Sequence, residues 1–248
     1  MNVALASFAV APGLALGSFV TVIAARVPAR QSIVSPTSSC GSCSAPIARR
    51  DNVPLLSYAL LRGRCRRCAA RIPMRYPLIE FATALLVAGS LLVYGATAEA
   101  ALAALFCTVL VTLSVIDLEH RIVPNRIVLP AAALVLVART ALDPSPEWLV
   151  GALGAAGFLL VAALAYPGGM GMGDVKLALL LGAMLGRNVP VALMAGLIAG
   201  LLPSIVLFAR HGGAARKMAL PFAPFLAIGG LIALFAGERV LDAYLSTL

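Results

Sequence analysis

Long apolar runs recur along almost the whole chain and constrain its fold more than any other feature. A helix needs about 20 largely apolar residues to cross a bilayer. Eight runs of roughly this kind are present, at residues 3–25, 78–95, 99–116, 127–142, 148–166, 175–186, 189–209 and 220–237. The fourth and sixth runs are short for a straight crossing, so their ends are the least defined. The sequence therefore predicts an all-α polytopic membrane protein with about eight transmembrane helices.

Composition supports this fold class and excludes several others. Hydrophobic residues make up 61% of the 248 residues and charged residues 12%, whereas soluble domains are roughly 45–50% apolar and about 25% charged. An ordinary soluble enzyme, a disordered chain and a secreted disulfide scaffold are all excluded. No Lys or Arg precedes Arg26, so we expect the first run to be a retained helix rather than a cleaved signal peptide.

Basic residues are concentrated between the first two runs. From Arg26 to Arg75 the sequence has ten arginines and one acidic residue, Asp51. A basic segment flanked by apolar spans is typical of a cytoplasmic loop that faces anionic head groups, and we favour this over nucleic-acid binding. With the first helix starting outside, the expected inside loops are 117–126, 167–174 and 210–219. The turns on the opposite side carry mostly acidic residues, as the positive-inside rule requires.

The basic segment also carries two Cys-x-x-Cys pairs. Cys40 and Cys43 are separated from Cys65 and Cys68 by a spacer of 21 residues. Two such pairs complete a tetrahedral site of four thiolates, which favours a structural zinc ion with no open position for substrate. A redox pair would need a βαβ setting, and two disulfides would need an oxidising compartment. Cys107 lies alone in an apolar run, so we expect it to be core packing.

Two aspartates mark the edges of apolar runs. Asp117 follows the run 99–116, and Pro124 disfavours helix at the residue before it, so we expect the helix to end just after Asp117. Asp174 follows a stretch with four glycines in positions 168–173, which predicts irregular chain beside water at the inner face. Each aspartate can be a plain surface charge. The alternative is an aspartic-protease-like pair, in which one carboxylate activates water and the other polarises the scissile carbonyl.

Several motifs occur in a characteristic order along the chain. They are Gly17-Ser18-Phe19-Val20 with Arg26-Val27-Pro28, Asp51 to Ser57 through Gly63-Arg64-Cys65, Arg75 to Glu80, Ile116-Asp117-Leu118, Gly171 to Leu177, and Pro221 to Phe225. With these motifs the chain resembles the type IV prepilin peptidases, which are bifunctional leader peptidases and N-methyltransferases of bacterial inner membranes. The resemblance runs nearly from end to end, and the ordered set is far more specific than the Gly-x-Gly-Asp motif alone.

The resemblance implies a catalytic pair and a substrate. Asp117 and Asp174 become the two carboxylates of an aspartic endopeptidase, with Gly171, Gly173 and Lys176 as the supporting motif. The implied substrates are the basic leader peptides of type IV prepilins or type II secretion pseudopilins, cut after a glycine at the cytoplasmic face. The new N-terminal residue is then methylated from S-adenosylmethionine. The four cysteines are carried over as the zinc site of the cytoplasmic part.

The sequence departs from the family pattern at a few positions. Thr21 stands where an Asn is familiar, and Glu119 and Asn125 stand where further aspartates are common, which leaves Asp117 as the only aspartate in its loop. No glycine-rich dinucleotide fingerprint is present, so residue patterns do not locate a site for S-adenosylmethionine. Glu80 is the one candidate for a polar contribution to it, against the simpler interpretation of a helix-end carboxylate near arginines.

The expected organisation has three parts: a first transmembrane helix at 1–25, a cytoplasmic zinc-binding domain at 26–77, and a seven-helix peptidase domain at 78–248. Two other classes of function are considered. A small transporter would relay protons through Asp117 and Asp174, but it would be expected to carry carboxylates near mid-span and often an internal repeat. A zinc-domain membrane adaptor without catalysis would leave the glycine-rich stretch and both aspartates unexplained.

Overall fold

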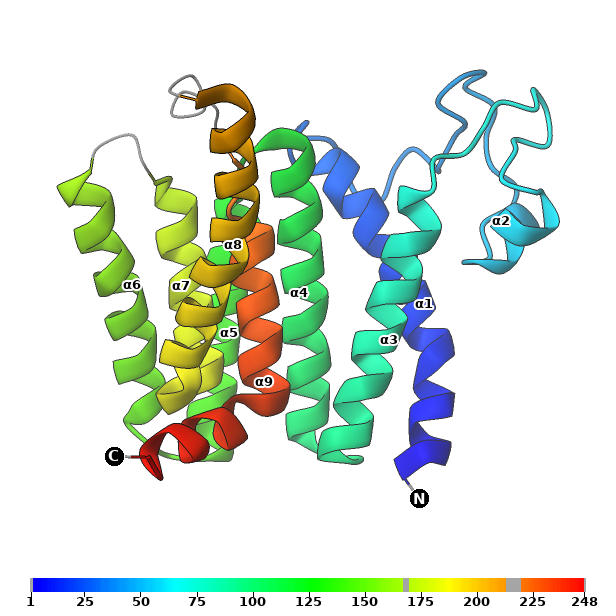
Figure 1. Ribbon diagram of the computed structural model, residues 1–248. Helices are drawn as coiled ribbons and strands as arrows, with labels where there is room; N and C mark the ends of the chain where they lie inside the picture. The colour runs from blue at the N-terminus through cyan, green and yellow to red at the C-terminus, as the bar shows by residue number, and fades with distance from the viewer. Residues whose placement is uncertain (1, 167–169, 213–219, 248) are drawn as a thin grey trace. The chain divides into compact units, whose positions relative to one another are not determined.

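The chain is helical throughout the described residues, as the apolar runs predict. The computed structural model describes residues 2–166, 170–212 and 220–247 (Figure 1). Within these ranges there is no strand, only two isolated β-bridges. The long helices are α1 (Asn2–Arg26), α3 (Arg75–Tyr94), α4 (Ala98–His120), α5 (Asn125–Leu142), α6 (Glu147–Ala165), α7 (Met172–Leu185), α8 (Val189–His211) and α9 (Ala223–Leu245). Three short helical segments are η1 (Arg49–Asp51), α2 (Leu56–Leu60) and η2 (Gly186–Asn188).

Each of the eight predicted apolar runs corresponds to one long helix, so the predicted all-α polytopic fold is confirmed. Among the described residues, seven helical segments are long and apolar enough to cross a membrane, one of them the continuous stretch Met172–His211. That stretch contains both α7 and α8, and Figure 1 shows the chain reversing direction between them. The turn is at Gly186, whose φ of +51° is in the left-handed region that favours glycine. At 14 residues, α7 is shorter than a straight crossing requires.

Two expected inside loops fall partly outside the described residues. These parts are 167–169, in the glycine-rich stretch, and 213–219, which includes Arg216 and Lys217. Packing divides the chain into two compact units, residues 1–112 and 113–248. We call these unit 1 and unit 2. The expected separation into a first helix, a cytoplasmic domain and a peptidase domain stays a prediction.

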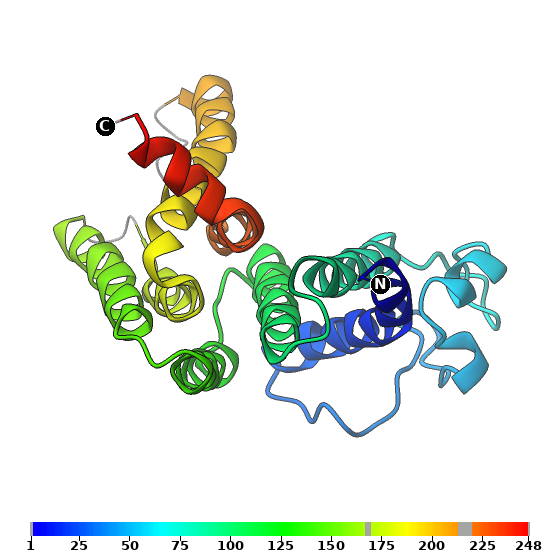
Figure 2. The same ribbon diagram turned by 90° about the horizontal axis from the view of Figure 1, so that it is seen from below.

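In unit 1, α1 packs side by side with α3 (Figure 1 and Figure 2). Small residues permit this contact. A Cβ atom added to Gly13 would lie 2.7 Å from the Cα of Ala84, and one added to Gly17 would lie 2.6 Å from the Cα of Glu80. Glycines spaced four residues apart let the backbones of membrane helices approach closely.

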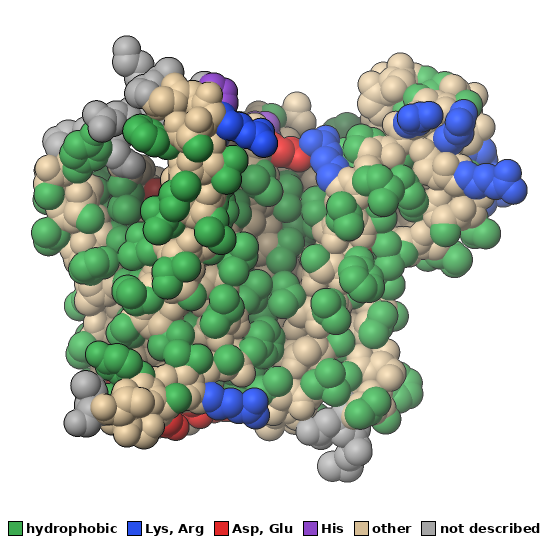
Figure 3. All heavy atoms as spheres, viewed as in Figure 1, with side chains coloured by type: hydrophobic (Ala, Val, Ile, Leu, Met, Phe, Trp, Pro, Cys, Tyr) green, Lys and Arg blue, Asp and Glu red, His purple; other side chains and the backbone are tan. Residues whose placement is uncertain are grey.

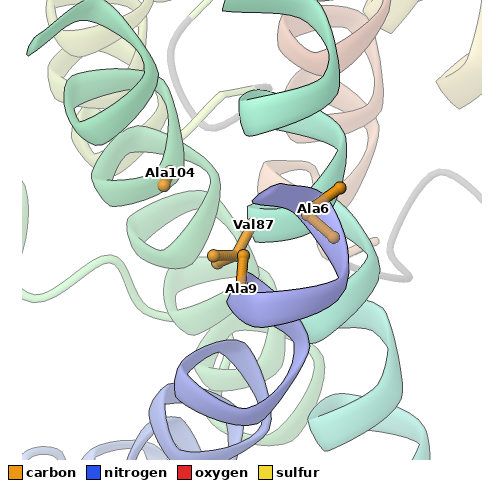
Figure 4. Close-up of a cluster of buried hydrophobic side chains, with 5 residues drawn as sticks. Ala6, Ala9, Val87 and Ala104 are labelled. Carbon is orange, nitrogen blue, oxygen red and sulfur yellow. The ribbon is translucent and has the colours of Figure 1, made fainter. Parts of the chain in front are cut away.

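A small cluster of buried apolar side chains joins the N-terminal half of α1 to α3 and α4. It contains Ala6 and Ala9 of α1, Val87 of α3 and Ala104 of α4 (Figure 4). All four side chains are buried. Between α1 and α3 the chain forms only η1 and α2, and arginine side chains gather over this segment (Figure 3).

In unit 2, α7 is the central helix and packs against α5, α6 and α9. Ten of its 14 residues are buried. Close approach again depends on glycine, because a Cβ atom on Gly182 of α7 would collide with the backbone of Gly151 in α6. Gly229 of α9 lies in the same way against Ala192 and Gly196 of α8.

Large apolar side chains cover the outer faces of the helices (Figure 3). Phe8 of α1, Val161 of α6 and Leu202 of α8 are among the exposed ones. Water would disfavour so much exposed apolar surface, whereas lipid does not. Together with the length and hydropathy of the helices, this identifies a multi-pass membrane protein.

Candidate active site and cysteine cluster

Asp117 lies in the last turn of α4 and is buried, with 6% of its surface exposed. Its Oδ2 atom accepts a hydrogen bond of 3.0 Å from the backbone N–H of Ala223, the first residue of α9. The first N–H groups of a helix have no partner within that helix and readily bind anions. The N-terminus of α9 therefore fixes one oxygen of the Asp117 carboxyl group.

Asp174 lies in the first turn of α7 and is also buried, with 9% of its surface exposed. Its backbone N–H donates a hydrogen bond of 3.1 Å to the carbonyl oxygen of Gly171. An acidic residue in the first turn of a helix interacts favourably with the helix dipole. The chain thus places a second buried carboxylate at a helix end.

The two carboxylates lie at the same end of unit 2, close enough to interact electrostatically. Gly173 explains how α7 comes so near. A Cβ atom on it would lie only 2.9 Å from the Cβ of Val123, in the connection between α4 and α5. Lys176 adds a polar link, because its Nζ donates a hydrogen bond of 2.8 Å to Oδ1 of Asn125.

Two sequence-based expectations about the backbone are wrong here. The helix does not end just after Asp117, because α4 continues to His120 and the N–H of Arg121 still bonds to the carbonyl oxygen of Asp117 at 2.8 Å. Pro124 restricts only the residue before it, which leaves room for this extra turn. Asp174 is not on irregular chain either, since α7 begins at Met172. Gly173 in the first turn of α7 lowers the helix propensity there. Its close approach to Val123 explains why a glycine is present at this position.

The neighbouring residues of the first motif have separate surroundings. Glu119 is exposed, as expected for a helical residue two positions beyond Asp117. His120 lies beside it, with Nε2 of the imidazole 3.9 Å from Oε2 of Glu119. Neither arrangement brings these side chains into the pair of aspartates.

Sequence reasoning missed three contributors to this site. They are the backbone N–H of Ala223, the side chain of Val123 and the amide of Asn125, which contact Asp117, Gly173 and Lys176 respectively. A backbone N–H leaves no trace in residue identity. The motif Pro221 to Phe225 was the available signal for the first, because a proline near the start of an apolar run is typical of a helix N-terminus.

The four cysteines of unit 1 come together as predicted. Their Sγ atoms all lie within 4.8 Å of one another, and those of Cys40 and Cys68 are 3.8 Å apart. Four thiolates around a zinc ion, at Zn–S distances of about 2.3 Å, are separated by about 3.8 Å. All four are free thiols rather than disulfides. The cluster can therefore hold a metal ion.

The two Cys-x-x-Cys pairs form matching turns. The N–H of Cys40 donates to the carbonyl oxygen of Ala45, and the N–H of Cys65 donates to that of Ala70. In each turn the carbonyl oxygen of the same cysteine accepts an N–H from four residues later. Isolated β-bridges close both turns, at Ser39–Pro46 and Arg64–Arg71.

These turns also favour the thiolate form of the first cysteine in each pair. The backbone N–H groups of Ser42 and Cys43 lower the pKa of the Cys40 thiol to about 6. Those of Cys68 and Arg67 lower the pKa of the Cys65 thiol. Thiolates are the form that binds zinc, so the backbone geometry and the type of donor both fit that ion.

An ion pair supports the same segment. Arg66 binds both oxygens of the Asp51 carboxylate, and the shortest of these contacts is 2.6 Å. Hydrogen bonds from Arg66 lower the pKa of Asp51. The single acidic residue of the basic segment is thus paired with one of its arginines.

Glu80 of α3 is buried, with 9% of its surface exposed. Its Oε2 atom accepts a hydrogen bond of 2.8 Å from the N–H of Leu55, and Ser18 of α1 bonds to the same carboxyl group. Neutral donors therefore hold this carboxyl group near the start of α3. Cys107 is buried beside Ser90, as expected for core packing.

Comparison with known proteins gives consistent matches along most of the chain. Residues 12–94 match the model of the bacterial peptidase A24 N-terminal domain, and residues 104–209 match that of the type IV leader peptidase family. A protein of Bacillus subtilis (strain 168) named prepilin leader peptidase/N-methyltransferase is 34% identical over 94% of this chain and 95% of its own length. A protein of the same name from Aeromonas salmonicida (strain A449) is 37% identical over 88% of this chain and 78% of its own length.

A third relative of that name, from Myxococcus xanthus (strain DK1622), is 41% identical over 70% of this chain and 54% of its own length. No solved structure matches the chain. The matched residues contain both buried aspartates and all four clustered cysteines. The chain belongs to the type IV leader peptidase family of enzymes.

Proposed function

We propose that this enzyme is a membrane aspartic endopeptidase that removes the basic leader peptides of type IV prepilins or of type II secretion pseudopilins. Cleavage follows a glycine at the cytoplasmic face of the bacterial inner membrane. The observation that carries the proposal is the pair of buried carboxylates, Asp117 and Asp174, at one end of unit 2. The names of the relatives support the choice of substrate.

Asp117 and Asp174 act together on the peptide bond. Two neighbouring carboxylates do not readily both ionise, so the pair retains one proton. The ionised carboxylate takes a proton from a water molecule, which attacks the carbonyl carbon of the glycine. The protonated carboxyl donates a hydrogen bond to the carbonyl oxygen, where negative charge develops. The C–N bond of the resulting tetrahedral intermediate then breaks, and the leaving amine takes a proton from the carboxyl pair. The N–H of Ala223 keeps the Asp117 carboxyl in one orientation during this exchange.

The surroundings of the pair serve to position it. Gly173 lets the first turn of α7 reach Val123, and the bond from Lys176 to Asn125 ties the same turn to the start of α5. Helix termini fix side-chain positions better than loops do, and small errors in position are costly in catalysis. Gly171 and Gly173 therefore have a structural role, as does Lys176.

Residues 26–77 form the cytoplasmic zinc-binding domain of this proposal. Cys40, Cys43, Cys65 and Cys68 hold a structural Zn²⁺, and the surrounding arginines face anionic head groups. The positive-inside rule assigns this segment to the cytoplasm, the side on which the aspartates would also lie. The zinc ion orders the segment and takes no part in peptide cleavage.

The second activity is N-methylation of the new N-terminal residue with S-adenosylmethionine as the donor. The relatives' names include N-methyltransferase. When bound, the donor supplies an electrophilic methyl group on a sulfonium. The amine exposed by cleavage is the nucleophile, so cleavage must come first.

Mass spectrometry of a co-expressed prepilin tests both activities. Wild type is compared with Asp117→Asn and Asp174→Asn. We expect the wild-type product to be shortened after a glycine and to carry one additional methyl group, and the prepilin to stay intact in both variants. A shortened product without the methyl group would refute the transferase. An intact prepilin and an intact pseudopilin beside well-inserted wild type would refute the peptidase.

The same variants discriminate against a proton-relay transporter. Such a protein would leave prepilins uncleaved and would lose ion or solute flux in the Asp→Asn variants. Both aspartates lie at helix ends rather than at mid-helix, which favours the peptidase.

A further inference from the structure

Unit 1 contains a cavity of about 570 Å³ between α1, the basic segment and the start of α3. Pockets that hold small organic ligands have volumes of about 300–1,000 Å³. Residues from all three parts line it, including Ser18, Arg50, Tyr58 and Glu80. The cavity is distinct from the pair of aspartates, which belongs to unit 2.

Glu80 is the unusual member of this lining. In the described part of the chain its carboxyl group is held by neutral donors, the N–H of Leu55 and the hydroxyl of Ser18. The other acidic residue of the lining, Asp51, is paired with Arg66. A buried carboxylate without a cationic partner is costly. A ligand that carries a positive charge would supply the missing partner.

The rest of the lining describes what such a ligand must carry besides a cation. Four further arginines line the cavity, and arginine is suited to binding a carboxylate. They are Arg50, Arg67, Arg71 and Arg75. Tyr58 and Tyr76 contribute aromatic surface against which a planar base can stack. The lining thus suits a ligand with a cationic centre, a carboxylate and a heteroaromatic ring.

We propose that this cavity binds S-adenosylmethionine, with the Glu80 carboxylate facing its positively charged groups and the arginines facing its carboxylate. The inference rests on the proposed methyltransferase function and gives it a location in unit 1. In the reaction, the lone pair of the substrate amine forms a bond to the methyl carbon, and the carbon–sulfur bond breaks with its electron pair left on sulfur. The products are S-adenosylhomocysteine and a methylated ammonium group that releases one proton to water.

The first test is binding to the full-length enzyme in detergent, measured by calorimetry with three probes. S-adenosylmethionine has a sulfonium, sinefungin has an ammonium in its place, and S-adenosylhomocysteine has a neutral thioether. Glu80→Gln keeps an acceptor for Leu55 but removes the charge. We expect it to weaken binding of the first two probes by about 10- to 100-fold and binding of S-adenosylhomocysteine clearly less. Glu99→Gln, on the exposed start of α4 in the same unit, is the matched control and should bind all three probes as wild type does.

A second variant guards against misfolding as the explanation. Thr21 lines the cavity from α1, and Thr21→Phe fills space there without altering any charge. It should weaken all three probes to a similar degree. Photo-crosslinking of radiolabelled S-adenosylmethionine to wild type should label peptides within residues 38–80.

Three results would overturn the inference. The first is that Glu80→Gln binds S-adenosylmethionine as tightly as wild type does. The second is that Glu80→Gln weakens the binding of all three probes equally. The third is a crosslinked peptide from residues 113–248 with none from unit 1. Any of these in an enzyme that still methylates prepilin would reject the site and leave the proposed function standing. Absence of both binding and methylation in wild type would reject the transferase itself, whereas leader cleavage would be unaffected.

Discussion

The two units of this enzyme hold their polar groups in place by different means. Between α1 and α3, residues 27–74 form only short helical segments, and Ser57 and Gly63 are the only buried residues. Order there depends on matched turns, a cysteine cluster and one ion pair. In unit 2, by contrast, α7 buries ten of its 14 residues, and Asp174 is one of them. A site built on packed helix ends and a site built on a stapled loop should therefore respond to different perturbations.

The strongest way to test this comparison is to remove the aspartates. Asp117→Ala and Asp174→Ala should each lower kcat/KM for prepilin cleavage by about 10⁴-fold, the upper end of what one acid–base group contributes. The protein should still insert and keep its unfolding temperature within a few degrees. Asp242→Asn in α9 is the control and should cleave normally. Equal loss of protein level in both alanine variants would instead indicate that the carboxylates are structural.

Removal of the metal ion should affect unit 1 and largely spare unit 2. Structural zinc binding is worth about 10–16 kcal/mol in zinc-finger peptides, so a site without metal is commonly unfolded. After chelation, or in Cys65→Ser, we expect rapid proteolysis within residues 27–74 and loss of one zinc per chain, with peptidase activity partly retained. Cys107→Ala should keep the metal. Complete loss of cleavage together with an intact segment would contradict the separation of the two sites.

A smaller effect is expected where α7 approaches the α4–α5 connection. Gly173→Ala places a methyl group 2.9 Å from the Cβ of Val123, which should displace the first turn of α7 and lower kcat/KM by about 10- to 100-fold. Val123→Ala in the same chain should restore much of the activity. Gly157→Ala in α6 has nothing within 4 Å of the added atom and should be neutral. No rescue in the double variant would show that packing at this contact is not the cause.

The smallest effect is expected at the polar link beside the pair of aspartates. Lys176→Met removes a hydrogen bond of 2.8 Å to Asn125. Such a bond is worth about 0.5–1.5 kcal/mol, or roughly two- to tenfold in kcat/KM. Asn125→Ala should have a similar effect, and the double variant should be little worse than either single one. Arg187→Met at the exposed pair with Glu238 is the control. Additive losses at Lys176 and Asn125 would mean that the two side chains act separately.

Much of this architecture is readable from local sequence. Each apolar run became one long helix, and the Cys-x-x-Cys spacing predicted the cluster of four thiols, because hydropathy and short-range turn geometry are properties of neighbouring residues. The two wrong predictions of helix ends were also drawn from neighbouring residues. Pro124 suggested a helix end too early at Asp117, and the glycine-rich stretch hid the start of α7 at Met172. At the first position, Pro124 constrains only the residue before it, so α4 continues past Asp117. At the second, the first turn of α7 packs closely against Val123 through Gly173.

The sequence by itself determined the membrane fold, the family and the identity of the two aspartates and four cysteines worth examining. Tertiary structure decided what surrounds them. The N–H of Ala223 reaches Asp117 across 106 positions of the chain, and the N–H of Leu55 reaches Glu80 across 25. Apolar periodicity specifies that a helix is present but not which backbone groups its ends meet. These hydrogen bonds between distant parts of the chain depend on the close packing of small residues between helices. Only the folded chain therefore defines the two sites.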